Sequence, residues 1–294
     1  MGIIAIIAAL ILEQWRPLGD RKAVFLALSG WADWLERSFN AGESRHGMIA
    51  WLIAALAPVA AALALYYALY WLSPFAALLL NVAALYLTLG FRQFSHYFTG
   101  IQAAVRDGEI DRARELIGAW RGREEVIRLA IEEAIAASHR HVFAVLFWFV
   151  VLPGPSGAIL YRMAVFLNRR WGGKGEFGRF AGCALNVLEW PAVRLTAAAF
   201  AVVGDFEDAV YCWRTQAAAW GDRNLGIVLA AGAGALGVRL GMPLSEVEGL
   251  YARNDLGVGD PADAPFLDST VGLLWRALVV WVFVLIVIAL ARAL

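Results

Sequence analysis

The residues most able to do chemistry are ionisable side chains that interrupt apolar stretches. Glu189 and Arg194 interrupt one such stretch, and Tyr161 and Arg162 interrupt another. A charged side chain at membrane depth is costly and normally faces a bundle interior or a wet cavity. Glu189 and Arg194 are therefore candidate site residues. Arg162 could hold an anionic ligand or form a structural salt bridge with a nearby acid, and the sequence leaves both roles open.

The composition is that of an integral membrane protein. Of the 294 residues, 61% are hydrophobic and 17% are charged, whereas a soluble domain is about 45–50% apolar and about 25% charged. The zero formal net charge gives no reason to expect a nucleic-acid partner. We expect a multi-pass protein of the bacterial inner membrane, with the lipid bilayer as its surroundings. An oligomer is compatible with the sequence.

Apolar runs predict the helices that this bilayer would need. Residues 48–72 predict a spanning helix, residues 74–90 a second, and residues 275–291 a last span. Residues 23–39 follow the helical period and predict an amphipathic helix at the interface. Flanking arginines favour a cytoplasmic location for the polar, helical insert at residues 91–141.

A proline-rich break lies near the middle of the apolar residues 142–167. Pro153-Gly154-Pro155 removes two amide donors and disfavours helical geometry in the residues before it. We therefore expect a re-entrant hairpin of two half-helices, lined by protein. The predicted fold is all-α: a multi-spanning helical bundle with this hairpin and amphipathic cytoplasmic helices, in a single membrane domain over residues 1–294.

Two short patterns resemble known binding motifs, one for a dinucleotide and one for a metal ion, but their sequence context favours neither kind of site. Residues 232–237 match the glycine spacing of a dinucleotide fingerprint, but Gly241-Met242-Pro243 stops any following helix early, so small-residue packing is the better account. His139 and His141 are two residues apart and do not share a helix face, which makes them a poor metal-ligand pair. We expect interfacial hydrogen bonding from them and predict no metal site.

Motifs spread over nearly the whole chain resemble one protein family. They include Leu18-Gly19-Asp20, Leu146-Phe147-Trp148, the stretch from Gly157 to Arg162, the stretch from Trp190 to Thr196, and the stretch from Gly234 to Leu240. Together they resemble the CobD/CbiB proteins of cobalamin biosynthesis and their divergent relatives, the AmpE-type membrane proteins linked to β-lactamase induction.

The resemblance implies an enzymatic activity, but this chain departs from the motifs of the family's enzymes at several positions. The family's enzymes are membrane proteins that condense adenosylcobyric acid with an aminopropanol derivative at the expense of ATP, making an amide. Such carboxylate activation needs Mg²⁺ and cationic groups around the phosphates. Where the enzymes offer acids or amides, this chain has residues 136–141, Val165, Asn168, Leu185 and Asn186. These differences argue against the standard reaction and look more like the AmpE side.

The matching positions add three residues to the candidates, namely Asp20, Glu132 and Arg239. We expect the grouped charges to compensate one another, because scattered charges at membrane depth would be hard to sustain. Most of the set should therefore converge on one pocket open to the cytoplasm: Glu132, Tyr161, Arg162, Glu189, Arg194 and Arg239. Arginines outnumber acids in it, which suits an anionic small molecule or a corrinoid.

Two functions from different classes remain open. The leading interpretation is a ligand-binding accessory or regulatory protein without the usual acidic motifs. The alternative is an amide-forming synthase that requires ATP and Mg²⁺ and uses a rebuilt acidic set of Asp20, Glu132 and Glu189.

Overall fold

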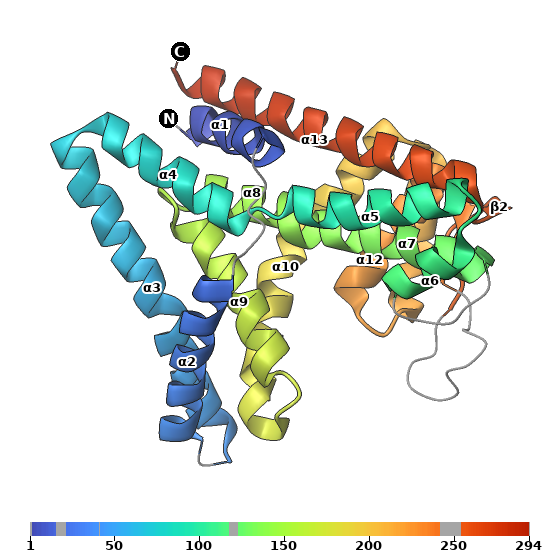
Figure 1. Cartoon of the computed structure of the whole chain (residues 1–294). Helices are drawn as coiled ribbons and strands as arrows, with labels where there is room; N and C mark the ends of the chain where they lie inside the picture. The colour runs from blue at the N-terminus through green and yellow to red at the C-terminus, as the bar shows by residue number, and fades with distance from the viewer. Residues whose placement is uncertain (1, 16–21, 41, 118–122, 242–253, 294) are drawn as a thin grey trace. The chain divides into compact units, whose positions relative to one another are not determined.

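The chain forms two compact units of helices. The computed structural model describes residues 2–15, 22–40, 42–117, 123–241 and 254–293 (Figure 1). The first unit combines Met1–Gly90 with Ala144–Trp190, and the second combines Phe91–Phe143 with Pro191–Leu294. The polar insert predicted at residues 91–141 lies wholly inside the second unit.

The predicted all-α fold is confirmed. In the described residues the only strands are β1 (Val238–Arg239) and β2 (Asp260–Pro261), which pair in parallel. Within the part of the chain that the structure describes, three helical runs are long and apolar enough to cross a membrane: Ser44–Leu72, Glu125–Val151 and Ala264–Ile288. Two of these runs cover or overlap the spans predicted at residues 48–72 and 275–291. The span predicted at residues 74–90 is instead a shorter apolar helix, Pro74–Thr88, and Glu125–Val151 was not predicted as a span.

The first unit is built on a hairpin of two apolar helices. Its helices are α1 (Gly2–Trp15), α2 (Lys22–Phe39), α3 (Ser44–Leu72), α4 (Pro74–Thr88), α8 (Ala144–Val151), α9 (Ser156–Trp171) and the first part of α10 (Gly175–Val203). Helix α3 ends at Leu72, and after the cap residue Ser73 the proline Pro74 begins α4, the helix position where proline is best tolerated. Trp71 is 87% exposed and Leu72 is 81% exposed. Such exposed apolar surface at the end of a long apolar helix suits contact with lipid.

The proline-rich break is a turn, as the sequence predicts. Helix α8 ends at Val151, α9 begins at Ser156, and Gly154 between them has φ of 59°. A Cβ on Gly154 would lie 2.7 Å from the Tyr66 ring, so only glycine fits there. The first arm is longer than a half-helix, because α7, η1 and α8 follow one another from residue 123 to residue 151 without a break.

The second unit packs around α7. Its elements are α5 (Phe91–Arg106), α6 (Ile110–Ile117), α7 (Arg123–Ser138), the π-helix η1 (His139–Phe143), the last part of α10, α11 (Phe206–Thr215), the 3-10 helix η2 (Ala217–Ala219), α12 (Arg223–Leu236) and α13 (Ala264–Ala293). Helix α7 contacts α5, α6, α12 and α13. Its Ile127, Ile131 and Ile135 are at most 1% exposed, so α7 forms the core of this unit.

Candidate functional site

The predicted site residues are divided between the two units. The first unit holds Tyr161, Arg162 and Glu189, and the second holds Glu132, Arg194 and Arg239. Asp20 lies outside the described residues. The predicted convergence of all six on one pocket spans both units and stays a prediction. Within each unit, however, the structure shows what these residues contact.

In the first unit, the buried side chains of Tyr161 and Glu189 meet. Tyr161 is fully buried and Glu189 is 3% exposed. The Tyr161 hydroxyl donates to Glu189 Oε1 at 3.4 Å. A buried carboxylate needs hydrogen-bond partners, and this phenol supplies one. Arg162, the next residue of α9, is half-buried.

The turn between α8 and α9 positions Tyr161 by bringing the two backbones into direct contact. A Cβ on Gly157 would lie only 1.8 Å from the carbonyl oxygen of Trp148. The Trp148 indole Nε1 in turn donates to the carbonyl of Leu188 at 3.1 Å. The motif residues Trp148 and Gly157 therefore fix the geometry that delivers Tyr161 to Glu189.

In the second unit, Glu132 holds the chain where it leaves β1. Glu132 is 7% exposed, and its Oε1 accepts a hydrogen bond from the Gly241 amide at 3.0 Å. Gly241 has φ of 78°, and a Cβ there would lie 2.1 Å from the carbonyl of Asn254. At least one oxygen of Glu132 thus has a structural role. Arg239, in β1, is exposed.

The glycine-rich stretch before β1 is a packing surface, which confirms the interpretation favoured from the sequence. A Cβ on Gly232 would lie 2.9 Å from the Ile135 side chain, and a Cβ on Gly234 would lie 2.4 Å from the Asp208 carbonyl. Gly237 ends α12 in the left-handed conformation, with φ of 66°. All three glycines are accounted for by packing and capping.

The π-helix η1 carries a second polar group that the sequence only partly revealed. His139 is 3% exposed, and its Nδ1 lies 3.0 Å from Thr196 Oγ1. The Thr196 hydroxyl donates to Ala192 at 2.9 Å, so His139 Nδ1 is the donor in the other bond. His139 therefore forms a hydrogen bond as predicted, with a partner from α10, but the bond is buried and not interfacial.

Arg140, next to His139, lies near Asp222, a charged neighbour that the sequence did not predict. Its Nη2 lies 3.9 Å from Asp222 Oδ2. Asp222 also caps α12, because its Oδ1 accepts from the amides of Asn224 and Leu225. Burial lowers the pKa of Arg194, and the positive charge of Arg223 lowers it further. An aspartate just before an apolar helix is a recognised start signal that could have revealed this end of α12.

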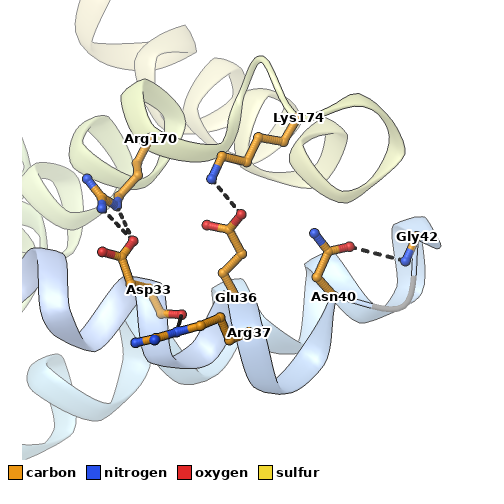
Figure 2. A network of polar contacts seen from close by, with 7 residues as sticks. All are labelled: Asp33, Glu36, Arg37, Asn40, Gly42, Arg170 and Lys174. Carbon is orange, nitrogen blue, oxygen red and sulfur yellow. Dashed lines mark hydrogen bonds and ion pairs between the residues drawn. The ribbon is translucent and has the colours of Figure 1, made fainter.

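Two ion pairs in the first unit join α2 to the end of α9 and the turn after it (Figure 2). Arg170 pairs with Asp33, and Lys174 pairs with Glu36. The hydrogen bond from Arg170 is the main reason that the pKa of Asp33 lies below its usual value. From the sequence, lipid headgroups are the favoured partners of these two basic side chains, which follow the hairpin. The structure instead places both in intramolecular pairs.

One open pocket of about 600 Å³ lies in the second unit, between β2, the start of α13 and Ile127 of α7. Asp260 and Asp263 contribute carboxylates to its lining, beside the ring of Phe266. None of the predicted site residues lines it. The described residues contain no group of three or more His, Cys, Asp or Glu side chains that could hold a metal ion.

Comparison with known proteins identifies the same family that the sequence motifs resemble. A family model described as CobD/Cbib protein matches residues 6–274. The chain belongs to the CobD/CbiB family. The cobalamin biosynthesis protein CobD of Stutzerimonas stutzeri strain A1501 is 34% identical over 298 residues, covering 96% of this chain and 96% of that protein. The protein of the same name from Chromobacterium violaceum is 36% identical over 219 residues, covering 71% and 70%. No solved structure matches.

Membership of the CobD/CbiB family confirms the family resemblance, whereas the likeness to AmpE-type proteins and a regulatory role stay predictions. The family's chemistry implies Mg²⁺ and ATP, and among the described residues no cluster of three or more acids, histidines or cysteines marks a metal site. Glu132 accepts from Gly241 and Glu189 from Tyr161, and no third acid joins either one within the described residues. ATP and Mg²⁺ therefore stay predictions of the synthase interpretation.

Proposed function

We propose that this protein works in cobalamin biosynthesis, in the membrane. The observation that carries the proposal is its 34% identity to a cobalamin biosynthesis protein over 96% of both chains. Similarity of that extent preserves the arrangement of helices as well as single motifs. The three apolar helical runs support a place in the membrane.

Within that role, the first candidate activity is the binding of an anionic intermediate without amide synthesis. The acids that a synthase would use for Mg²⁺ have structural partners in this chain, Gly241 for Glu132 and Tyr161 for Glu189. Hard cations need several oxygen ligands together. Arginines dominate the remaining candidates, and guanidinium groups recognise phosphate and carboxylate directly.

The second candidate is amide synthesis driven by ATP and Mg²⁺. The full-length match to proteins named for cobalamin biosynthesis favours it. In this candidate Asp20, Glu132 and Glu189 would form the acidic set, and Glu132 would offer the metal its oxygen that is not bonded to Gly241.

A deletion of the gene in its own host tests the shared proposal. We expect the deletion strain to need added cobalamin or a late corrinoid intermediate for cobalamin-dependent growth. Restoration by the intact gene on a plasmid is the control. Normal cobalamin levels in the deletion strain would contradict a role in the pathway.

A single assay then separates the two activities. Purified protein is incubated with ATP, Mg²⁺, adenosylcobyric acid and aminopropanol phosphate, and the amide is measured by mass spectrometry. The binding candidate expects no amide. An amide that forms with the intact protein and with Glu133→Gln, but disappears with Glu132→Gln, would establish the synthase; Glu133 is the exposed neighbour of Glu132 on α7.

A further inference from the structure

The open pocket of the second unit, about 600 Å³ in volume, takes no part in the function proposed above. It lies between β2, the start of α13 and Ile127 of α7. Ligand pockets in proteins usually have volumes of about 300–1,000 Å³ and are mostly apolar, with a few polar groups that select the ligand. This pocket has that composition, because five of its seven lining residues are apolar and the other two are Asp260 and Asp263.

The backbone on one side of the pocket is held in place by hydrogen bonds. Strand β2 pairs with β1, and the Asp260 amide donates to the carbonyl of Gly237 at 3.1 Å. Shortly before β2, the side chain of Gln216 grips the backbone of Gly257: its Oε1 accepts from the Gly257 amide at 2.6 Å, and its Nε2 donates to the Gly257 carbonyl at 3.2 Å. A wall fixed in this way is preorganised, so a ligand does not have to order it on binding.

The two carboxylates of the pocket have no counter-charge in the part of the chain that the structure describes. Neither Asp260 nor Asp263 forms an ion pair with a described residue, and none of the residues that line the pocket is basic. Asp263 uses one oxygen at the start of α13, where its Oδ1 accepts from the Ala264 amide at 2.6 Å. The lining therefore carries two negative charges and no positive charge.

Arginines on the neighbouring elements are engaged, buried or directed elsewhere. Arg106 on α5 is paired with Asp268, further along α13, at 3.2 Å. Arg128 on α7 is only 4% exposed. Arg239 in β1 is in register with the residue that follows Asp260. Because successive side chains of a strand point to opposite faces, the Arg239 side chain lies on the face opposite to that of Asp260.

The apolar part of the lining favours an organic cation over a metal ion. Hard cations such as Ca²⁺ take about six to eight oxygen ligands, and the described residues contain no group of three acids, histidines or cysteines that could hold a metal. Pro261 and Pro265 instead offer apolar surface, and Phe266 offers an aromatic ring. Apolar surface gains by covering methylene groups, and the face of an aromatic ring attracts an ammonium group.

We propose that this pocket binds an aliphatic diamine or polyamine. One ammonium group neutralises Asp260, a second neutralises Asp263, and the methylene chain lies on the apolar walls. A diamine supplies the two positive charges that the lining lacks, whereas a monoamine supplies one. The inference does not depend on a role in cobalamin biosynthesis, because it rests on the charge and the lining of the pocket alone.

Putrescine is the probe. The full-length protein is reconstituted in nanodiscs of zwitterionic phosphatidylcholine, which offer the amine no anionic lipid, and binding of radiolabelled putrescine is measured by equilibrium dialysis in EDTA against empty nanodiscs. We expect saturable binding that weakens as the salt concentration rises, because both aspartates are exposed. Butylamine, which has the same chain and one charge, should compete about threefold to tenfold less well.

Two asparagine variants test the carboxylates. Asp260→Asn and Asp263→Asn should each weaken putrescine binding about threefold to tenfold, and the double variant should abolish saturable binding. Asparagine keeps an oxygen that can accept from the Ala264 amide, so the start of α13 retains its cap. Asp107→Asn is the matched control, because Asp107 is an exposed aspartate of the same unit that does not line the pocket, so the affinity should not change.

A thermal unfolding curve for each variant shows that it is folded, and Asp260→Asn gives a valid result even if Asp263→Asn does not fold. Absence of saturable putrescine binding, or an Asp260→Asn variant that binds like Asp107→Asn, would overturn the proposal. Equal competition by butylamine would also overturn it, because one carboxylate would then have no role. Displacement of putrescine by an equal concentration of Mg²⁺ without EDTA would make the pocket a metal site instead.

Discussion

Replacing Glu132 by alanine tests whether this residue is a structural clamp. The change removes the acceptor of the Gly241 amide, which is bonded to Glu132 Oε1 at 3.0 Å in a buried position. Hydrogen bonds to charged groups contribute about 1.5–3 kcal/mol, and a buried donor without a partner costs about 1–3 kcal/mol. We therefore expect Glu132→Ala to lower the free energy of unfolding by at least about 1.5–3 kcal/mol.

The melting temperature of the detergent-solubilised protein measures this loss. For a chain of this size a loss of 1 kcal/mol corresponds to about 2–4 °C, so the expected decrease is on the order of 3–12 °C. Glu132→Gln should lose less, because its amide oxygen can still accept from Gly241.

Glu133→Ala is the matched control, since Glu133 has the same chemistry on the same helix but is exposed. Exposed substitutions of this kind usually change stability by less than about 0.5 kcal/mol. Equal melting temperatures for Glu132→Ala and Glu133→Ala would refute the clamp. A large loss of amide synthesis in Glu132→Gln with unchanged stability would instead place Glu132 in a catalytic role.

Three further predictions use other described features. Gly234→Ala should destabilise the protein by about 1–3 kcal/mol or more, because the added Cβ would lie 2.4 Å from a backbone oxygen. Gly272→Ala in α13 is the control and should be neutral or stabilising, because nothing lies within 4 Å of its added Cβ. The melting temperatures of the two variants measure the difference. Asp33→Asn should lower the melting temperature at neutral pH, and the two proteins should melt alike in acid. The pKa of Asp33 in the folded protein lies below the usual 3.8. The stabilisation by the Asp33 carboxylate is therefore complete above pH 3.8 and is lost as the pH falls through the folded-state pKa. Burial, and then the charge of Asp208, raise the pKa of Cys212 to about 11, so its thiolate fraction at pH 8 is about 0.1%. Iodoacetamide at pH 8 should therefore modify the exposed Cys183 in the folded protein and should modify Cys212 only after unfolding. Equal rates of modification of the two cysteines in the folded protein would contradict this.

Hydropathy and breaker residues were enough to predict most of the helices. The apolar run at residues 48–72 and the turn at residues 153–155 appear where the sequence places them. Helix α13 begins at Ala264, earlier than the predicted span at residue 275, because Pro265 is a helix-start signal rather than a sign of a loop. Helix α5 lies inside the insert predicted to be helical at residues 91–141, although the sequence did not give its bounds. The two-residue strands are too short to show a period.

The contacts of the candidate residues could not be predicted in the same way. Glu132 and Gly241 are separated by 109 residues, and Tyr161 and Glu189 by 28. Local periodicity says which residues share a face, but it carries no information about which face of another helix they meet. The resemblance indicated that Glu132 matters, and only the coordinates show that one of its oxygens holds a backbone amide.

The same contacts explain how this chain can keep the family's motifs while differing from them in its acids. Several motif residues hold the fold: Gly157 lets α9 contact the Trp148 carbonyl, Gly234 lets α12 contact α11, and Glu132 secures Gly241. Selection on such residues follows packing and buried hydrogen bonds, which any ligand-binding version of the fold must retain. Several of the positions that differ are also buried, among them Ser138 at 1% exposed and His139 at 3%. At another of the positions that differ, Arg140 supplies a cation near Asp222 and Arg223, in a stretch where the resemblance leads us to expect acids.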